Sequence, residues 1–267
     1  MFKKLSLKSF LSDTKVDFMG IHKLVILISV ISIVASIILA VVHGFNFGID
    51  FSGGVLIEAR LKEKIDLSKI RDVLSVGEIG EISIQNLDES DIIIRVSSSK
   101  NSDQSLIIKK IQQTLDNNFS GIEYRKVDFV GPQVGKELIK NGLLALILSF
   151  IFIMIYIWIR FDWQFGIGAV AALFHDTFLT FGFFSLTGLE FNLTSIAAIL
   201  TIIGYSINDS VVIYDRIREN LRKFKKAGLS DLINSSINST LSRTVLTSGI
   251  TLVSLIALII FGGEALR

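Results

Sequence analysis

The chain has 267 residues, half of them hydrophobic, with a single proline, no cysteine and a mean hydropathy of +0.59. This composition is too apolar for an ordinary water-soluble domain and indicates a membrane protein. The net charge of +2 gives no reason to expect a nucleic-acid partner, and three scattered histidines without cysteine make a metal centre improbable, so we expect neither metal nor cofactor.

Five apolar segments approach or reach the length needed to cross a bilayer. A hydrocarbon core about 30 Å thick requires roughly 20 mostly apolar residues in a helix. The first segment has too long an apolar run, and no small-x-small cleavage pattern, for a signal peptide, so it is expected to be a retained anchor. The segments are 24–42, 138–159, 164–189, 192–214 and 244–263.

The distribution of positive charges predicts how these segments are oriented. Lysines precede the first segment, Arg160 follows the second, and the basic run from Arg216 to Lys226 follows the fourth. If the spans alternate in direction, all three places lie on one side, which the positive-inside rule makes the cytoplasm. Residues 1–23 are therefore expected to be cytoplasmic and to be followed by the first transmembrane helix over 24–43.

Residues 44–137 have the pattern of a small α+β domain, which this orientation places outside. Apolar residues at helical spacing predict helices over 66–76 and from Ser102 to Leu115, with Asp103 in the first turn. The resulting order of strand, helix, strand, strand, helix, strand is that of a ferredoxin-like fold. Strands are predicted over 55–61, 79–85, 92–96 and 122–130.

Residues 138–267 should form the transmembrane bundle, interrupted by a long basic loop over 215–243. Glu219 and Lys223 in this loop have i,i+4 spacing. We expect two short helices at the cytoplasmic surface, which touch anionic membrane lipid rather than form a specific docking site.

Asp209, preceded by Asn208, is the most informative residue because it interrupts the fourth span. A carboxylate in a span costs about 2.5–3.5 kcal/mol, so it should face the bundle interior or a wet cavity, unless it lies at the interface. Arg243 is the candidate partner, because the two residues flank Gly228 almost symmetrically on antiparallel helices. A pair that opens and closes would bind protons with conformation-dependent affinity. Alternatively, Arg243 is a snorkelling anchor.

His175 and Asp176 form a second polar position, near the middle of the third span. Adjacent helical residues diverge by about 100°, so one may face a neighbouring helix and the other a cavity. The two residues either extend a proton relay or make an interhelical hydrogen bond that fixes packing.

Two glycine-bearing stretches flank the α+β domain. They read "GFNFGIDFSGG" over 44–54 and "VGPQVG" over 130–135. Glycine adopts dihedral angles closed to other residues and proline stiffens a turn, so these stretches are expected to shape the connection between domain and membrane rather than bind a ligand.

Several of these stretches together resemble one family. "GIDFSGG", "VGPQVG", "LFHD", "IGYSINDSVVIYDRIREN", "RTVLTS" and "FGG" occur in the order seen in SecF proteins of the bacterial export machinery, from the first span to the last residue. The resemblance implies an RND-like helix bundle in the inner membrane. It also implies a complex with SecD at the SecYEG translocon, with YajC and YidC as further partners, that uses the proton-motive force to promote late translocation of preproteins.

By the same resemblance, the family's proton-linked aspartate falls on Asp209 and its functional arginine on Arg243, with another essential carboxylate supplied by SecD. The resemblance also implies that the ferredoxin-like domain over 44–137 is periplasmic. SecF proteins have six spans, whereas five are present here, so the sixth helix is expected to be missing and the carboxyl terminus to lie outside.

Two other functions fit parts of the sequence. A proton-coupled RND-type small-solute exporter would need an enclosed pocket and usually both transporter halves in one chain. An intramembrane aspartyl protease would use Asp176 and Asp209 on a peptide bond, with "YD" at Tyr214 and Asp215, but the glycine-flanked second aspartate of such enzymes is absent from the sequence. The expected function is therefore a non-enzymatic subunit of protein export.

Overall fold

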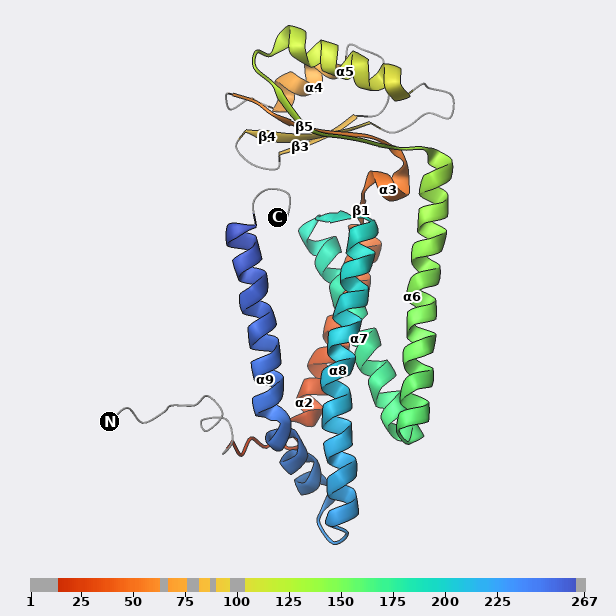
Figure 1. Ribbon diagram of the computed structural model, residues 1–267, viewed down its shortest axis with the longest axis vertical. Helices are drawn as coiled ribbons and strands as arrows, with labels where there is room; N and C mark the ends of the chain where they lie inside the picture. Colours follow the sequence, from red (N-terminus) through yellow and green to blue (C-terminus); the bar gives the residue numbers. More distant parts are fainter. Residues whose placement is uncertain (1–13, 63–66, 76–81, 87–89, 97–103, 263–267) are drawn as a thin grey trace, which may run out of the picture. The chain divides into compact units, whose positions relative to one another are not determined.

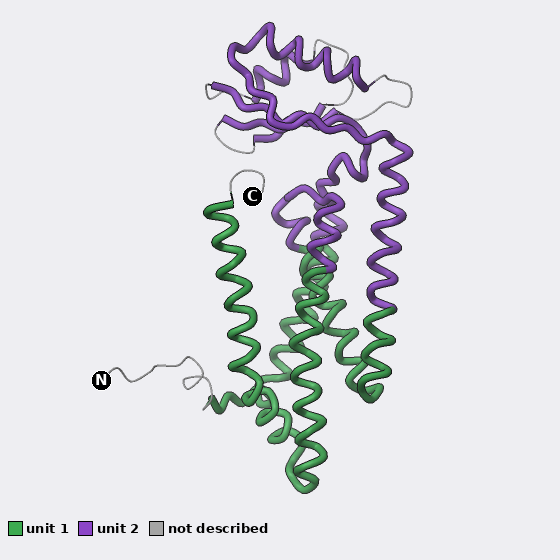
Figure 2. Tube along the Cα trace, in the orientation of Figure 1, with its two compact units in different colours: residues 1–38, 152–182, 201–267 green, residues 39–151, 183–200 purple. Residues whose placement is uncertain are grey.

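The computed structural model describes residues 14–62, 67–75, 82–86, 90–96 and 104–262 (Figure 1). The chain divides into two compact units (Figure 2). Unit 1 comprises residues 1–38, 152–182 and 201–267, and unit 2 comprises residues 39–151 and 183–200.

Unit 2 contains the predicted ferredoxin-like domain. The four strands of this domain form one antiparallel sheet in the order β3-β4-β2-β5, and the helices α4 and α5 cover the same face of the sheet (Figure 1). This arrangement confirms the predicted fold. In chain order the elements are β2 (Gly54–Arg60), α4 (Leu67–Ser75), β3 (Ile82–Asn86), β4 (Asp91–Val96), α5 (Gln104–Asn118) and β5 (Glu123–Val130).

The core of this domain follows from the period of two in its strands. Alternate residues of a strand point to the same face, so every second apolar side chain of β2 and β4 is buried under the helices. Each such burial contributes about 1.5–3 kcal/mol. The fully buried side chains include Val55 and Ile57 of β2, Ile94 and Val96 of β4, Ile70 and Leu74 of α4, and Ile111 and Leu115 of α5.

The predicted element ends differ little from the observed ones. Helix α5 continues three residues past Leu115, to Asn118. Its predicted start at Ser102 and Asp103, and the first residues of the strand predicted over 79–85, lie outside the described residues.

Among the residues that the structure describes, five helices are long and apolar enough to cross a membrane, which confirms the predicted spans. Helix α6 begins at Pro132, so the boundary predicted between 137 and 138 falls inside a helix. Proline suits the first turn because its missing N–H has no partner there. The helices are α2 (His22–Val42), α6 (Pro132–Arg160), α7 (Trp163–Thr187), α8 (Leu193–Lys223) and α9 (Leu229–Phe261).

The prediction of a loop with two short surface helices over 215–243 is wrong. Helix α8 continues without a break to Lys223 and α9 begins at Leu229. Ion pairs from Glu219 to Arg216 and Lys223 support the extension of α8, and Asn220 Nδ2 donates to Ser236 Oγ of α9 at 2.8 Å in a buried contact. The loop was predicted from the end of the apolar stretch. The polar contacts described above allow both helices to continue beyond that point.

In unit 1, the helices α2 and α7 approach closely at two small residues. Ser36 and Gly182 are buried, and a Cβ built on Gly182 would lie 2.9 Å from Ser36 Cα. Because the obstructing atom belongs to the backbone, the contact cannot yield by a side-chain rotation. Small residues allow such approach between membrane helices.

Residues 16–19, just before α2, form a strap along α9 that the sequence analysis missed. Val16 N donates to Asn238 Oδ1 and Asn238 Nδ2 donates back to Val16 O, both at 2.9 Å. Met19 N donates to Asn234 Oδ1 at 2.9 Å, and Asp17 Oδ1 accepts from Asn234 Nδ2 at 2.7 Å. The sequence feature that could have indicated the strap is the pair Asn234 and Asn238, because i,i+4 spacing places both on one helix face.

We predict that Gly182→Ala lowers the free energy of unfolding by about 1–3 kcal/mol, because the added methyl group overpacks the contact with Ser36. Gly249→Ala of α9 is the matched control, since a Cβ there would meet nothing within 4 Å. Denaturant titration in detergent measures both. Equal stability of the two variants would contradict the close α2–α7 contact.

We also predict that the strap responds to acid. Hydrogen bonds from Asn234, and then from the Gly20 amide, lower the pKa of Asp17 below its usual 3.8. A depressed pKa means that the contribution of Asp17 is present above pH 3.8 and is lost as the pH falls through the folded value. The amide shift of Gly20 in NMR should report this midpoint. Asn234→Ala should move the midpoint up toward 3.8, and an unchanged midpoint would exclude the contact.

Candidate functional site

Asp209 lies within α8, and its side chain is half-buried while that of Asn208 is exposed. Ser206, three residues earlier, shares the helix face of Asp209. Within the described part of the chain, the carboxylate of Asp209 makes no hydrogen bond or ion pair. The structure therefore places a half-buried, unpaired carboxylate one turn from Ser206.

The second predicted position connects α7 to α8. Ser206 Oγ donates to Asp176 Oδ2, and His175 Nδ1 lies 2.9 Å from Asp176 Oδ1. Both the His175 and the Asp176 side chains are 29% exposed. The two side chains contact each other, and Asp176 also faces the neighbouring helix α8, which is the interhelical hydrogen bond expected from the sequence. Asp176 therefore contacts the next residue of its own helix and accepts a hydrogen bond from α8, and the identity of Ser206 as the donor came only from the fold.

Arg243 lies exposed on α9, and among the described residues its guanidinium has no ion-pair or hydrogen-bond partner. The expected Asp209–Arg243 pair is thus not formed in this arrangement. The contact of Asn220 with Ser236, and one of 3.0 Å from Arg216 Nε to Ser239 Oγ, fix the alignment of α8 with α9 near their connection.

Continued toward the apolar region, this alignment places Asp209 level with Thr247, one turn beyond Arg243. One helical turn is about 5.4 Å, a distance that an extended arginine side chain can span. In Figure 1 the second half of α9 stands apart from α8, and its apolar window is unburied. The pair therefore stays a prediction that requires α9 to approach α8.

The hydroxyl groups of α9 mostly bond to their own helix. Thr247 Oγ1 donates to Arg243 O at 2.9 Å and Thr251 Oγ1 to Thr247 O at 3.1 Å. Thr244 Oγ1 differs, because it is buried without a partner in the described part of the chain. A hydroxyl that donates to the carbonyl four residues earlier in its own helix needs no partner from another helix.

At the far end of α8, Asp215 pairs with Arg160 Nη2 of α6 at 3.0 Å. Tyr214 packs with Phe161 and Phe165 in an aromatic cluster. Asp215 is therefore a partner in an ion pair, and Tyr214 a packing residue, rather than members of a protease site. Among the described residues, no group of three or more His, Cys, Asp or Glu side chains is arranged to hold a metal ion.

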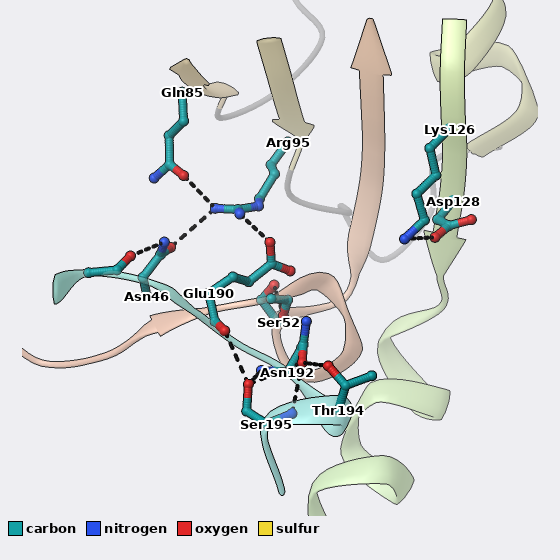
Figure 3. Close-up of polar contacts among 12 residues, drawn as sticks. Asn46, Ser52, Gln85, Arg95, Lys126, Asp128, Glu190, Asn192, Thr194 and Ser195 are labelled. Atoms are coloured by element: carbon teal, nitrogen blue, oxygen red, sulfur yellow. Dashed lines mark hydrogen bonds and ion pairs between the residues drawn. The ribbon is translucent and has the colours of Figure 1, made fainter. Parts of the chain in front are cut away.

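Unit 2 holds a polar cluster that the sequence analysis did not identify (Figure 3). Arg95 of β4 contacts Glu190 and Asn46, which belong to two short strands, β6 (Glu190–Phe191) and β1 (Asn46–Phe47). These strands pair in parallel. No periodic pattern marks strands of two residues, so only the fold brings these three side chains together.

Two family profiles match the chain. Residues 110–267 match the family described as protein export membrane protein SecD/SecF, C-terminal, and residues 38–65 match the SecD/SecF GG motif. The second match includes the first glycine-bearing stretch, 44–54.

Curated relatives and solved structures agree with the profiles. The chain is 55% identical over 253 residues to protein translocase subunit SecF of Rickettsia bellii (strain OSU 85-389), covering 94% of this chain and 84% of that protein. It is 54% identical to the SecF subunit of Rickettsia felis, covering 82% of it.

A crystal structure of SecDF, a translocon-associated membrane protein from Thermus thermophilus, aligns with a TM-score of 0.87 and 34% identity over 96% of this chain. A second SecDF structure, in a super-membrane-facing form, aligns with a TM-score of 0.67 and 33% identity. This chain spans about 35% of the length of each of these two solved chains. The chain is a multi-pass membrane protein that belongs to the SecD/SecF family of protein export membrane proteins and, within it, to the SecF subunits.

Proposed function

We propose that this chain is a proton-driven accessory subunit of preprotein export in a bacterial inner membrane. In this proposal it forms a complex with SecD, acts at the SecYEG translocon with YajC and YidC as further partners, and promotes late translocation of the preprotein to the periplasm. Its relatives are named protein translocase subunits. The observation that carries the proton-driven part is the polar cluster of α7 and α8, in which Asp176 and Ser206 are bonded and Asp209 lies a turn away.

The energetic cost of these carboxylates supports a functional role. Each ionised group in a span costs about 2.5–3.5 kcal/mol to insert, and intramembrane carboxylates are typical of proton pathways. Asp176 recovers part of this cost through Ser206 and His175, whereas Asp209 has no partner in the described structure. An unpaired carboxylate is free to take up a proton or to receive a cation.

We assign the following roles. Asp209 takes up and releases protons, and Arg243 changes the proton affinity of Asp209 when α9 brings it closer. Asp176, with His175 beside it, exchanges protons along the same helix face through the Ser206 hydroxyl, which both donates and accepts. Asn208, exposed next to Asp209, adds a polar side chain to the same turn of α8.

The available energy sets a limit on each cycle. One charge that crosses about 100 mV supplies roughly 2.3 kcal/mol, which biases a conformational equilibrium but does not move a long chain in a single step. Export would therefore require many cycles, with protonation favouring one conformation and release the other.

We predict that Asp209→Asn abolishes the part of export that depends on the proton gradient. Inverted membrane vesicles that contain SecD and the channel measure export with and without a gradient, at equal amounts of assembled protein. Asp215→Asn on the same helix is the matched control, since its carboxylate is 59% exposed and pairs with Arg160. If Asp209→Asn keeps the full gradient response, Asp209 is structural and the proton pathway lies elsewhere.

We further predict that Ser206→Ala reduces gradient-dependent export several-fold, because Asp176 loses its only donor from α8 among the described residues. Ser210→Ala is the control, since Ser210 lies one turn further along α8 and makes no side-chain hydrogen bond in the described structure. The same vesicle assay applies. A variant that assembles poorly but exports normally per molecule would mean that the contact only fixes helix packing.

A further inference from the structure

The guanidinium of Arg95 joins three segments of unit 2. Arg95 lies on the sheet face opposite the helices, because its neighbours Ile94 and Val96 point into the helix-covered core. Its Nη2 donates to Glu190 Oε2, and its Nη1 donates to Asn46 Oδ1 at 3.1 Å and to Gln85 Oε1 at 3.4 Å (Figure 3). Asn46 Nδ2 in turn donates to Gly188 O at 2.9 Å.

The Arg95–Glu190 pair is largely buried. The side chains are 11% and 23% exposed, whereas those of the Lys126–Asp128 pair on β5 are 54% and 47% exposed. Removing one member of a buried pair leaves an uncompensated charge, so such pairs hold their segments together more firmly than exposed pairs do.

Further contacts fasten the same segments. Gly48 N donates to Phe191 O at 3.0 Å, and Asp50 Oδ2 accepts from Leu193 N, the first residue of α8, at 3.0 Å. A carboxylate at a helix N-terminus is favoured by the helix dipole and by the unpaired amides there. A Cβ on Gly48 would meet Glu190 Oε1 and lie 3.0 Å from Asn192 Cβ, so a larger residue there would require the Glu190 carboxylate to move.

The connection between α7 and α8 is therefore part of the same compact unit as the ferredoxin-like domain, and α8 runs without a break from Leu193 through Asp209. We propose that Arg95 is a coupling residue whose buried ion pair with Glu190 fixes the ferredoxin-like domain to the start of α8, so that the domain moves with that helix. The transmission of proton-linked motion to the domain rests on the proposed function, whereas the mechanical attachment does not.

The attachment can be measured with spin labels, because the chain contains no native cysteine. Asn117→Cys on α5 and Leu189→Cys in the α7–α8 connection are both exposed and define one distance, read by double electron–electron resonance in nanodiscs. We expect a narrow distribution in the parent protein and one at least twofold broader after Arg95→Gln or Glu190→Gln. Lys126→Gln is the matched control, since it removes an exposed ion pair of the same sheet, and it should leave the distribution narrow.

Two further variants separate coupling from simple loss of stability. The charge reversal Arg95→Glu with Glu190→Arg should restore a narrow distribution, and Arg95→Gln combined with Glu190→Gln should be no broader than either single change. Additive broadening in the double variant would mean that the two residues act independently. Unchanged distributions in both single variants would overturn the attachment, whatever Asp209 does.

The export assay tests the transmission. Arg95→Gln should reduce gradient-dependent export several-fold at equal assembly, and the charge reversal should recover most of it. A broadened distance with undiminished export would overturn the coupling role. If Asp209→Asn keeps its full gradient response while Arg95→Gln loses export, the proton role of Asp209 fails and the coupling by Arg95 stands.

Discussion

The hydrogen bond between Ser206 and Asp176 is the interaction on which the proposed mechanism most depends, because it joins two helices within stretches long and apolar enough to cross a membrane. Polar groups that leave water must find partners within the protein. Here a hydroxyl on α8 and an imidazole on α7 solvate one carboxylate, while the neighbouring Asp209 has none of these partners in the described structure.

The same requirement explains why α8 and α9 pack at one end and separate toward the other. Near their connection, buried polar contacts such as Asn220 to Ser236 hold the two helices at a fixed alignment. Farther along, the Thr247 and Thr251 hydroxyls of α9 donate to carbonyls of their own helix and not to α8. An approach of α9 that brings Arg243 to Asp209 would break few specific contacts.

The glycine-bearing stretches show how sequence constraints at the membrane boundary arise. Gly53 has a φ of 71°, which disfavours any residue with a side chain, and a Cβ on Gly135 would press against the backbone oxygens of Asp50 and Phe51. These glycines allow α3 (Ile49–Ser52) to pack against the start of α6. The Arg95 cluster adds a charged attachment beside this packed turn.

The sequence by itself determined the five spans, the ferredoxin-like order of strands and helices, and the polar residues within the spans, because each of these depends on local periodicity or on the cost of a charge in hydrocarbon. It placed Asp209 and Arg243 on neighbouring helices, but the fold decided their alignment, since a helix pair can shift by a turn without changing its apolar pattern. The predicted end of α8 and the predicted start of α9 were wrong, because hydropathy does not reveal the polar contacts that extend helices beyond the apolar region. The contacts of Asp176 with Ser206 and of Arg95 with Glu190 join residues 30 and 95 positions apart, and only tertiary structure brings such distant side chains together.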